Sequence, residues 1–320
     1  MSGPALQVSN LEVAFRRGGE LQPVVDGVSL ELAAGQISGL VGESGCGKSV
    51  TAQALMGLLP ARSALTSATS LRINGEQLAK ASARQWRAVR GYTMAMIFQE
   101  PDRALDPVFT VGTQIGNVIR RRDQVGKTAA REQSLKALAA SGFAQPESLL
   151  EAYPHQLSGG MRQLIMIAMA IAVRPVVLIA DEPTTALDVT TQALVLERLT
   201  RLTRRYNTAI LLVTHDLGVA ARCCSEVMVM YCGRLVEQGD YRGLFRHARH
   251  PYTSKLLAAV PRVGAEQPPR GIAGRVPALS EIPRGCRFAP RCSRADSSCR
   301  ASYPPLEALG SGRVACHHPL

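Results

Sequence analysis

A glycine-rich loop between an apolar strand and a helical segment constrains this chain of 320 residues more than any other feature. The loop is Gly42-Glu43-Ser44-Gly45-Cys46-Gly47-Lys48-Ser49, and it follows the apolar run 36–41. Glycines let the backbone curl so that amide N–H groups point at phosphate oxygens, and the N-terminus of the next helix adds positive charge. The sequence therefore predicts a phosphate-binding P-loop, with Lys48 on the β and γ phosphates and Ser49 on Mg²⁺.

Two acidic residues end a second apolar run. Asp181 and Glu182 follow the run 176–180 and precede Pro183. An acid at the tip of a buried strand beside a P-loop can bind Mg²⁺, and a second acid can orient or deprotonate a water. An ordinary helix cap would explain one acid but not two. We therefore predict that Asp181 is a Mg²⁺ ligand and that Glu182 is a general base.

Strand and helix patterns alternate through the first 260 residues. Apolar strands are predicted at 36–41, 93–98, 176–180 and 209–213, and helices at 48–59 and 190–205. This alternation favours an α/β domain in which ligands collect at the C-terminal ends of parallel strands. Beyond Pro261 the composition changes, because nine of the 19 prolines and four of the eight cysteines lie between there and Pro319. We place a domain boundary near 260.

The net charge of +12 does not indicate a nucleic-acid surface. Arginine supplies 32 of the 37 basic residues, and they are scattered apart from Arg120 to Arg122. A phosphate-tracking surface would gather them into a stripe, so we expect no nucleic-acid partner. The longest apolar run, Leu164 to Val173, is far shorter than the roughly 20 residues that a membrane span needs. We also see no signal peptide and expect a cytosolic chain.

A third polar segment decides which P-loop family fits. Leu157-Ser158-Gly159-Gly160-Met161-Arg162-Gln163 leads into an apolar helix, and serine and glycine at a helix N-terminus make a second anion site. One chain does not need two such sites for one nucleotide. The segment resembles the signature motif of ATP-binding-cassette (ABC) ATPases, in which the serine of one subunit closes on the γ-phosphate held by the other subunit. The resemblance implies a RecA-like parallel sheet core, an antiparallel β subdomain and a helical subdomain at about 100–172, all within 1–260.

The remaining motifs follow in the order that this family shows. Gln99 resembles the Q-loop glutamine that touches Mg²⁺ and the attacking water, and Phe15 stands where the family places an adenine-stacking aromatic. The segment 185–188 resembles the D-loop at the dimer interface, and His215 resembles the switch histidine at the γ-phosphate. The catalytic residues implied by the resemblance are Lys48, Gln99, Glu182 and His215, and the Mg²⁺ ligands are Ser49, Gln99 and Asp181. The nucleotide contacts implied by it are Phe15, Gly42, Ser44, Gly45, Cys46, Gly47, Lys48, Ser49, Val50, Ser158, Gly159, Gly160 and Asp188.

Two further segments narrow the branch of the family. The segment from Gln99 to Gly112 and the element His250-Pro251-Tyr252 resemble the ATPases of oligopeptide, dipeptide and nickel importers, whose C-terminal extension here covers 261–320. The resemblance implies two membrane permeases, a second ATPase subunit that is paralogous or identical, and an extracytoplasmic substrate-binding protein. It also implies a peripheral position on the cytoplasmic face of the inner membrane. Dipeptides, oligopeptides, nickel and metal chelates all remain open as substrates.

Four cysteines stand in the proline-rich extension. Cys286, Cys292, Cys299 and Cys316 are separated by five, six and sixteen residues. A segment with so little apolar content cannot fold on its own core, so a bound metal would supply the missing stability. The gaps are wider than those usual for zinc, which favours an iron–sulfur cluster. The extension also resembles those of branch members that hold a [4Fe-4S] cluster, while zinc and free thiols stay open.

Two other functions compete with transport. An ABC ATPase of DNA repair or translation would suit the basic charge, but such proteins usually join two cassettes or insert a long module before the signature motif. Only 110 positions separate Lys48 from Ser158 here. A regulatory subunit that binds ATP without turnover is the other alternative, because Leu164 stands where the family usually has arginine. Glu182 and His215 are both present, which favours a competent site.

Overall fold

The structure is a computed structural model, and it describes residues 3–185, 187–261 and 271–320. The chain divides into two compact units. Unit 1 consists of Met1–Leu6, Glu31–Ile37 and Arg72–Leu212, and unit 2 consists of Gln7–Leu30, Ser38–Leu71 and Val213–Leu320. The chain passes from one unit to the other several times, so each unit combines segments that are distant in the sequence.

Unit 1 contains a pair of parallel strands. β7 (Met94–Ile97) runs parallel to β8 (Val177–Asp181), and β9 (Ala209–Thr214) follows β8 in the strand order. The residues of β8 and β9 are all buried, as expected for strands covered on both faces. β8 ends at Asp181, so this carboxylate stands at the C-terminal tip of a buried strand.

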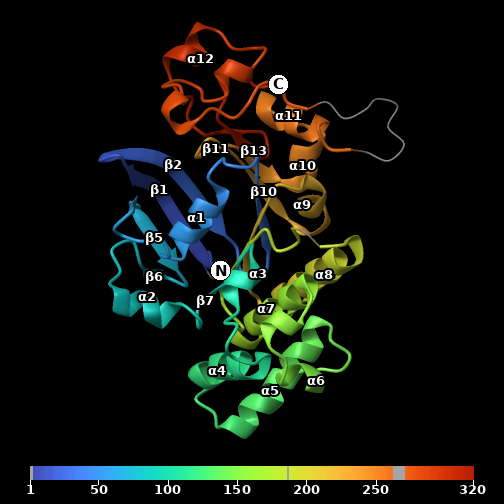
Figure 1. Cartoon of the computed structure of the whole chain (residues 1–320). Helices are drawn as coiled ribbons and strands as arrows, with labels where there is room; N and C mark the ends of the chain where they lie inside the picture. The colour runs from blue at the N-terminus through green and yellow to red at the C-terminus, as the bar shows by residue number, and fades with distance from the viewer. Residues whose placement is uncertain (1–2, 186, 262–270) are drawn as a thin grey trace. The chain divides into compact units, whose positions relative to one another are not determined.

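The helices of unit 1 pack around one apolar helix. α7 (Gly159–Val173) is buried on most of its faces, which requires neighbours all round. It contacts α3 (Pro101–Ala104), α4 (Val111–Asp123), α5 (Lys127–Ser141) and β7, and the helices α4 to α7 lie together in Figure 1. The other elements of this unit are β6 (Glu76–Gln77), α2 (Ala83–Val89), α6 (Glu147–Leu150), a 3₁₀ turn (Pro154–Gln156) and α8 (Val189–Tyr206).

Unit 2 contains the part of a mixed sheet that includes the strand before the P-loop. Its strand order is β12-β13-β11-β10-β3, and β3 (Ile37–Val41) pairs in parallel with β10 (Glu226–Tyr231). The remaining pairs are antiparallel and join β11 (Arg234–Asp240), β12 (Glu307–Leu309) and β13 (Gly312–Val314). The C-terminal region therefore contributes two strands to the sheet that carries the P-loop.

A second, antiparallel sheet is formed by the N-terminal strands. β1 pairs with β4 antiparallel, so that Phe15 stands opposite Ala64. The strand order is β2-β1-β5, and the antiparallel subdomain is of the kind expected. The bounds are β1 (Leu6–Arg17), β2 (Glu20–Leu32), β4 (Ala64–Ser67) and β5 (Ser70–Ile73).

The C-terminal region is anchored by an aromatic cluster in the core of unit 2. Tyr231, Tyr252 and Phe288 are almost completely buried, and their rings lie 4.6 to 5.3 Å apart. Phe288 thus supplies the apolar contact that the proline-rich sequence around it lacks. The helices of this unit are α1 (Lys48–Leu55), α9 (Leu217–Cys223), α10 (Tyr241–Arg246), α11 (Pro251–Ala258) and α12 (Ser297–Ala301), with 3₁₀ turns at Leu279–Glu281 and Ala289–Arg291.

The four predicted strands and the helix after Glu182 are confirmed, each within one or two residues at either end. The helix predicted at 48–59 ends earlier, at Leu55, because Gly57 takes a left-handed conformation with φ 60° and stops it. The helices α3 to α7 occupy the range predicted for the helical subdomain. The boundary at 260 stays a prediction, and 262–270 lie outside the described residues, as does Ala186 of the D-loop segment. No helix among the described residues combines the length and hydropathy needed to cross a bilayer.

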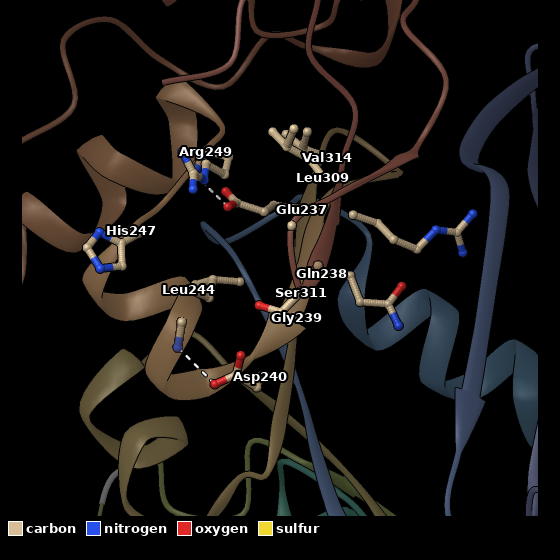
Figure 2. A pocket seen from close by; sticks show the side chains of 14 residues that line it. Glu237, Gln238, Gly239, Asp240, Leu244, His247, Arg249, Leu309, Ser311 and Val314 are labelled. Atoms are coloured by element: carbon tan, nitrogen blue, oxygen red, sulfur yellow. Dashed lines mark hydrogen bonds between the residues drawn. The ribbon is translucent and has the colours of Figure 1, made fainter.

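A small cavity of about 110 Å³ lies beside β11 in unit 2 (Figure 2). It is lined by residues of β11, α10 and the turn between β12 and β13. In its wall the Glu237 carboxylate accepts a hydrogen bond from the Arg249 backbone N–H at 2.6 Å, and Asp240 caps α10 by accepting one from Gly243 N–H at 2.8 Å. The cavity contains none of the residues predicted for the nucleotide site.

Candidate nucleotide-binding site

The predicted P-loop leaves β3 at Val41 and ends where α1 begins at Lys48. Gly47 caps this helix in a left-handed conformation with φ 103°. A Cβ atom on Gly42 would overlap the backbone oxygen of Met230, so only glycine fits there. Ser44 and Gly45 are exposed at the crest of the loop. The sequence thus folds into the strand, loop and helix that a phosphate cradle needs.

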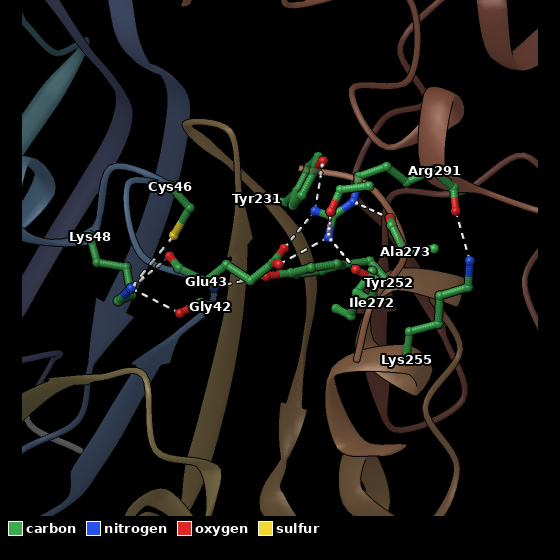
Figure 3. Close-up of polar contacts among 11 residues, drawn as sticks. Gly42, Glu43, Cys46, Lys48, Tyr231, Tyr252, Lys255, Ile272, Ala273 and Arg291 are labelled. Carbon is green, nitrogen blue, oxygen red and sulfur yellow. Dashed lines mark hydrogen bonds and ion pairs between the residues drawn. The ribbon is translucent and has the colours of Figure 1, made fainter. Parts of the chain in front are cut away.

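Lys48 is buried inside the loop. Its ammonium donates hydrogen bonds to the carbonyl oxygens of Gly42 at 2.9 Å and Glu43 at 3.0 Å (Figure 3). It also lies 3.8 Å from Cys46 Sγ. Burial raises the pKa of the Cys46 thiol, although Lys48 opposes this shift, so a neutral thiol packs beneath the loop. The backbone carbonyls of the loop therefore hold the Lys48 ammonium in a fixed position.

The sequence did not single out two partners of the loop, Tyr252 and Arg291. The backbone N–H of Glu43 donates to Tyr252 Oη at 2.9 Å, and the Glu43 carboxylate pairs with the Arg291 guanidinium at 2.7 Å. Tyr252 belongs to the His-Pro-Tyr element, which carried a family resemblance but no predicted role at the site. Both contacts join residues more than two hundred positions apart, so no local pattern predicts them.

Unit 1 brings two predicted catalytic residues together. Glu182 Oε2 accepts hydrogen bonds from Gln99 Nε2 at 3.1 Å and from Thr185 Oγ1 at 2.9 Å. Glu182 has φ 47°, a left-handed conformation that is uncommon for residues with a side chain. Asp181, one residue earlier, is buried at the end of β8. The carboxylates that the sequence placed beside each other thus have different surroundings.

The signature residues stand at the exposed N-terminus of α7. Ser158 is the N-cap residue, and its hydroxyl accepts a hydrogen bond from Met161 N–H at 3.3 Å. Gly159 and Gly160 form the first turn. Leu164 is buried in the helix packing, which suits an apolar side chain at that position.

The structure also places three further predicted residues, Asp188, His215 and Phe15. Asp188 caps α8 by accepting hydrogen bonds from the N–H groups of Thr190 and Thr191, both at 3.0 Å, and hydrogen bonds from Thr191 hold its pKa below the ordinary value. His215 is exposed directly after β9 in unit 2, and Phe15 is half-buried on β1.

The four cysteines of the extension differ in their burial. Cys286 and Cys299 are buried, Cys292 and Cys316 are partly exposed, and the Cys286 N–H donates to the Cys299 carbonyl at 2.7 Å. Burial and then the thiols of the other three raise the pKa of Cys316 to about 11.

A different set of donors lies in the same region. Ligand atoms of Asp296, Cys299 and His318 all lie within 4.8 Å of one another. The carboxylate of Asp296 is 2.8 Å from His318 Nε2. Cys299 therefore has neighbours of both kinds, cysteine thiols and an Asp–His pair.

Comparison with protein families gives two matches. The family described as ABC transporter matches residues 25–185, and the one described as oligopeptide/dipeptide transporter, C-terminal region, matches residues 236–299. The oligopeptide transport ATP-binding protein AppD of Bacillus subtilis is 43% identical over 97% of this chain and 94% of its own length. The dipeptide transport ATP-binding protein DppD of Escherichia coli is 44% identical over 98% and 97%.

Solved structures show the same fold. The dimeric ATP-binding cassette MJ0796, bound to ADP and Pi after hydrolysis, has a TM-score of 0.66 and 23% identity, covering 74% of this chain and 99% of that one. CbiO1 of Clostridium perfringens, from an ABC transporter complex, has a TM-score of 0.62 and 22% identity, covering 76% and 91%. With the family matches, they lead to one conclusion: this chain belongs to the ABC transporter family of ATPases and carries the C-terminal region of its oligopeptide/dipeptide transporters.

Proposed function

We propose that this chain is the ATP-hydrolysing subunit of an importer for di- or oligopeptides, acting on separate membrane permeases. The observation that carries the proposal is the buried Lys48 ammonium within a glycine loop, in a chain that resembles peptide-transport ATP-binding proteins along nearly its whole length. Lys48 and the loop amides would bind the β and γ phosphates. The nucleotide contacts predicted from the sequence are part of this proposal, including Phe15 beside the adenine.

The residues proposed for Mg²⁺ fit that ion in their chemistry. Asp181 offers a carboxylate, Ser49 a hydroxyl and Gln99 an amide oxygen, and Mg²⁺ prefers oxygen ligands. Asp181 is 3% exposed at the end of β8, and a buried carboxylate is costly unless a cation or donors compensate it. When bound, Mg²⁺ would neutralise charge that develops on the transferred phosphoryl group.

Glu182 is proposed as the general base toward the attacking water. Gln99 and Thr185 hold its carboxylate, which supports a fixed orientation for proton abstraction. His215 would contact the γ-phosphate from its exposed position after β9.

Ser158 is proposed to act on a nucleotide held by a second subunit. The N-terminus of α7 is exposed and presents amide N–H groups with partial positive charge, which suits an anionic phosphate. Hydrolysis would then require a dimer, with either a paralogous or an identical ATPase subunit. Asp188 would lie at the same interface.

The proposed partners are two permeases and an extracytoplasmic binding protein, with this chain on the cytoplasmic face of the inner membrane. The support is that the relatives are named as ATP-binding proteins of peptide transport. Those names favour peptides over nickel or metal chelates, and they favour transport over DNA repair or translation. A subunit that binds ATP without turnover is disfavoured by the ordered Glu182 carboxylate.

A [4Fe-4S] cluster on Cys286, Cys292, Cys299 and Cys316 is a further part of the proposal. Backbone N–H groups donate to the sulfurs, as Arg294 N–H does to Cys292 Sγ at 3.4 Å, and such donors are a known means of tuning Fe–S sites. The donor set Asp296, Cys299 and His318 supports zinc as the alternative. Anaerobic purification separates the two, because only the cluster gives a brown protein absorbing near 400 nm.

The test of the proposed function uses the intact complex with its permeases in vesicles. We expect ATP hydrolysis that peptide-loaded binding protein stimulates, and we expect Lys48→Ala to abolish nucleotide binding. Stimulation by DNA or ribosomes instead of peptide would overturn the proposal. Mass spectrometry of the ligand on the binding protein would identify the substrate class.

A further inference from the structure

Every polar group of the P-loop residue Glu43 is bonded. Its backbone N–H donates to Tyr252 Oη at 2.9 Å, its carbonyl accepts from Lys48 Nζ at 3.0 Å, and its carboxylate pairs with Arg291. Figure 3 shows Lys48 on one side of Glu43, and Tyr252 and Arg291 on the other. Glu43 therefore connects the lysine of the loop to two residues of the C-terminal half of the chain.

The pair between Arg291 and Glu43 is bidentate. Arg291 Nη1 lies 2.7 Å from Oε2, and Nη2 lies 3.0 Å from Oε1. Such forked pairs fix the geometry of both partners and are stronger than neutral hydrogen bonds. The Arg291 side chain is only 5% exposed, so water competes weakly for the carboxylate.

The guanidinium is also held by contacts other than the one with Glu43. Arg291 Nε donates to the Ala273 carbonyl at 3.0 Å, and Nη1 donates to Tyr231 Oη at 3.3 Å. The guanidinium carbon lies 5.9 Å from the ring centroids of Tyr231 and Phe288. Because these contacts order the arginine, little conformational entropy remains to be lost on pairing.

Tyr252 fixes the backbone of Glu43 as Arg291 fixes its side chain. The ring of Tyr252 is fully buried, 4.6 Å from Tyr231 and 5.3 Å from Phe288. Burial raises the pKa of its hydroxyl well above the ordinary range, so the hydroxyl stays neutral and accepts the Glu43 N–H. Two bonds from the C-terminal half thus set the position of the carbonyl that holds Lys48.

We propose that Arg291 and Tyr252 are positioning residues that set the P-loop for nucleotide phosphates through Glu43. The inference rests on the proposed phosphate site. It makes ATP affinity depend on the folded C-terminal region, because Arg291 lies in the 3₁₀ turn next to Cys292 and its carbonyl accepts from Lys255 Nζ at 2.7 Å.

The experiment measures the Kd of a fluorescent ATP analogue on the full-length chain. Loss of a charge-assisted bond that orders the loop should raise Kd about tenfold for Arg291→Gln, and KM should rise while kcat changes little. Glu43→Gln should have the same effect. The double variant should bind the ATP analogue with the same Kd as either single variant, because all three lack the same ion pair. The Kd of Arg291→Lys should lie between those of the wild type and Arg291→Gln, since lysine keeps the charge but cannot make the bidentate pair.

Arg275→Gln is the matched control. Arg275 and Glu281 form an ion pair in the same region at 3.1 Å, but their side chains are 82% and 50% exposed. This variant should leave Kd unchanged. Tyr252→Phe keeps the ring in the aromatic cluster and removes only the hydroxyl, so a threefold or greater rise in Kd is expected without loss of folding.

Three results would overturn the inference. One is an unchanged Kd in Arg291→Gln and Tyr252→Phe, another is the same rise in Arg275→Gln, and the third is multiplication of the single effects in the double variant. Lys48→Ala distinguishes a failure of the proposed phosphate site from a failure of the positioning role. If it leaves ATP binding intact, the phosphate site itself is misassigned; if it abolishes binding while Arg291→Gln does not weaken it, only the positioning role fails.

Discussion

Backbone strain and predicted chemistry coincide at Glu182. Its φ of 47° belongs to the left-handed region, which costs about 1 kcal/mol or more for residues with a Cβ atom. The conformation carries the carboxylate to Gln99 and Thr185, which both donate to Oε2. Strain that the surroundings maintain is typical of functional positions, and here it orders the group proposed as base.

Replacing this carboxylate by an amide should stop turnover but not binding. Glu182→Gln keeps the size of the side chain and removes the basic oxygen, so steady hydrolysis should fall at least 100-fold. Phosphate release and analogue binding measure the two effects. Glu197→Gln, which removes an exposed partner of Arg201, is the control and should hydrolyse normally. Hydrolysis near the wild-type rate in Glu182→Gln would exclude it as the base.

At the scale of elements, α11 begins with a buried histidine. His250 is the N-cap residue, and its Nδ1 accepts the Tyr252 N–H at 3.0 Å. The backbone N–H of His250 donates to the Glu237 carboxylate at 2.9 Å. Burial lowers the pKa of His250 to about 3, so the native protein keeps this ring neutral.

This cap predicts a loss of stability in acid. The unfolded chain takes up a proton on His250 near pH 6.5, while the native state resists it down to about pH 3. The free energy of unfolding should therefore fall between these values as pH decreases, by about 2 kcal/mol from pH 7 to 4.5. Denaturant titrations at both pH values measure it.

His250→Asn separates this effect from that of the carboxylates. Asparagine keeps an acceptor for the Tyr252 N–H but does not titrate. The variant should lose less stability on acidification than the wild type. An equal loss in both proteins would show that other groups cause the acid sensitivity.

At the scale of the whole molecule, the C-terminal region belongs to the structure that holds the P-loop. β13 pairs with β11, and Phe288 joins the aromatic core of unit 2. The buried Arg287 pairs with Asp26 and donates to the Cys232 carbonyl. The region that looks like an appendage in the sequence thus completes a sheet, a core and a charge network.

A chain truncated after residue 261 should therefore be strongly destabilised. Burial of Phe288 alone contributes about 2–3 kcal/mol, and removal of β13 leaves β11 without a partner on that side. Phe288→Ala should lower the midpoint of thermal unfolding, whereas Leu309→Ala, at a site that is 38% exposed, should change it little. A truncated chain as stable and as protease-resistant as the full one would contradict this prediction.

The sequence predicted the parts of the fold whose pattern is local. β3, β8 and β9 appear as short apolar runs because parallel strands are buried on both faces. The helix of the P-loop was predicted too long, since the stop at Gly57 depends on a single conformation. For the site, glycine spacing pointed to Lys48, the acidic pair after the strand pointed to Glu182, and family resemblance pointed to Gln99.

The contact between Glu43 and Arg291 could not be predicted in this way. It joins positions 248 residues apart, and the chain has 32 arginines, none of which is marked by its neighbours as the partner. The choice depends on the tertiary placement of the 3₁₀ turn at Ala289–Arg291. Tertiary packing determines which charged residues pair over such a distance, and it leaves no periodic pattern in the sequence from which the pair could be predicted.

The pairing of β13 with β11 limits which C-terminal segments of related subunits can replace the one in this chain. An incoming C-terminal segment, whether joined by recombination or by design, must supply a strand in register with Glu237 and Gln238. It must also present a cation to residue 43. A junction near 261 follows the change in composition, yet it divides a compact unit, because unit 2 includes Val213–Leu320. A chimera made there should take its P-loop from one parent and the residues that contact the P-loop from the other parent.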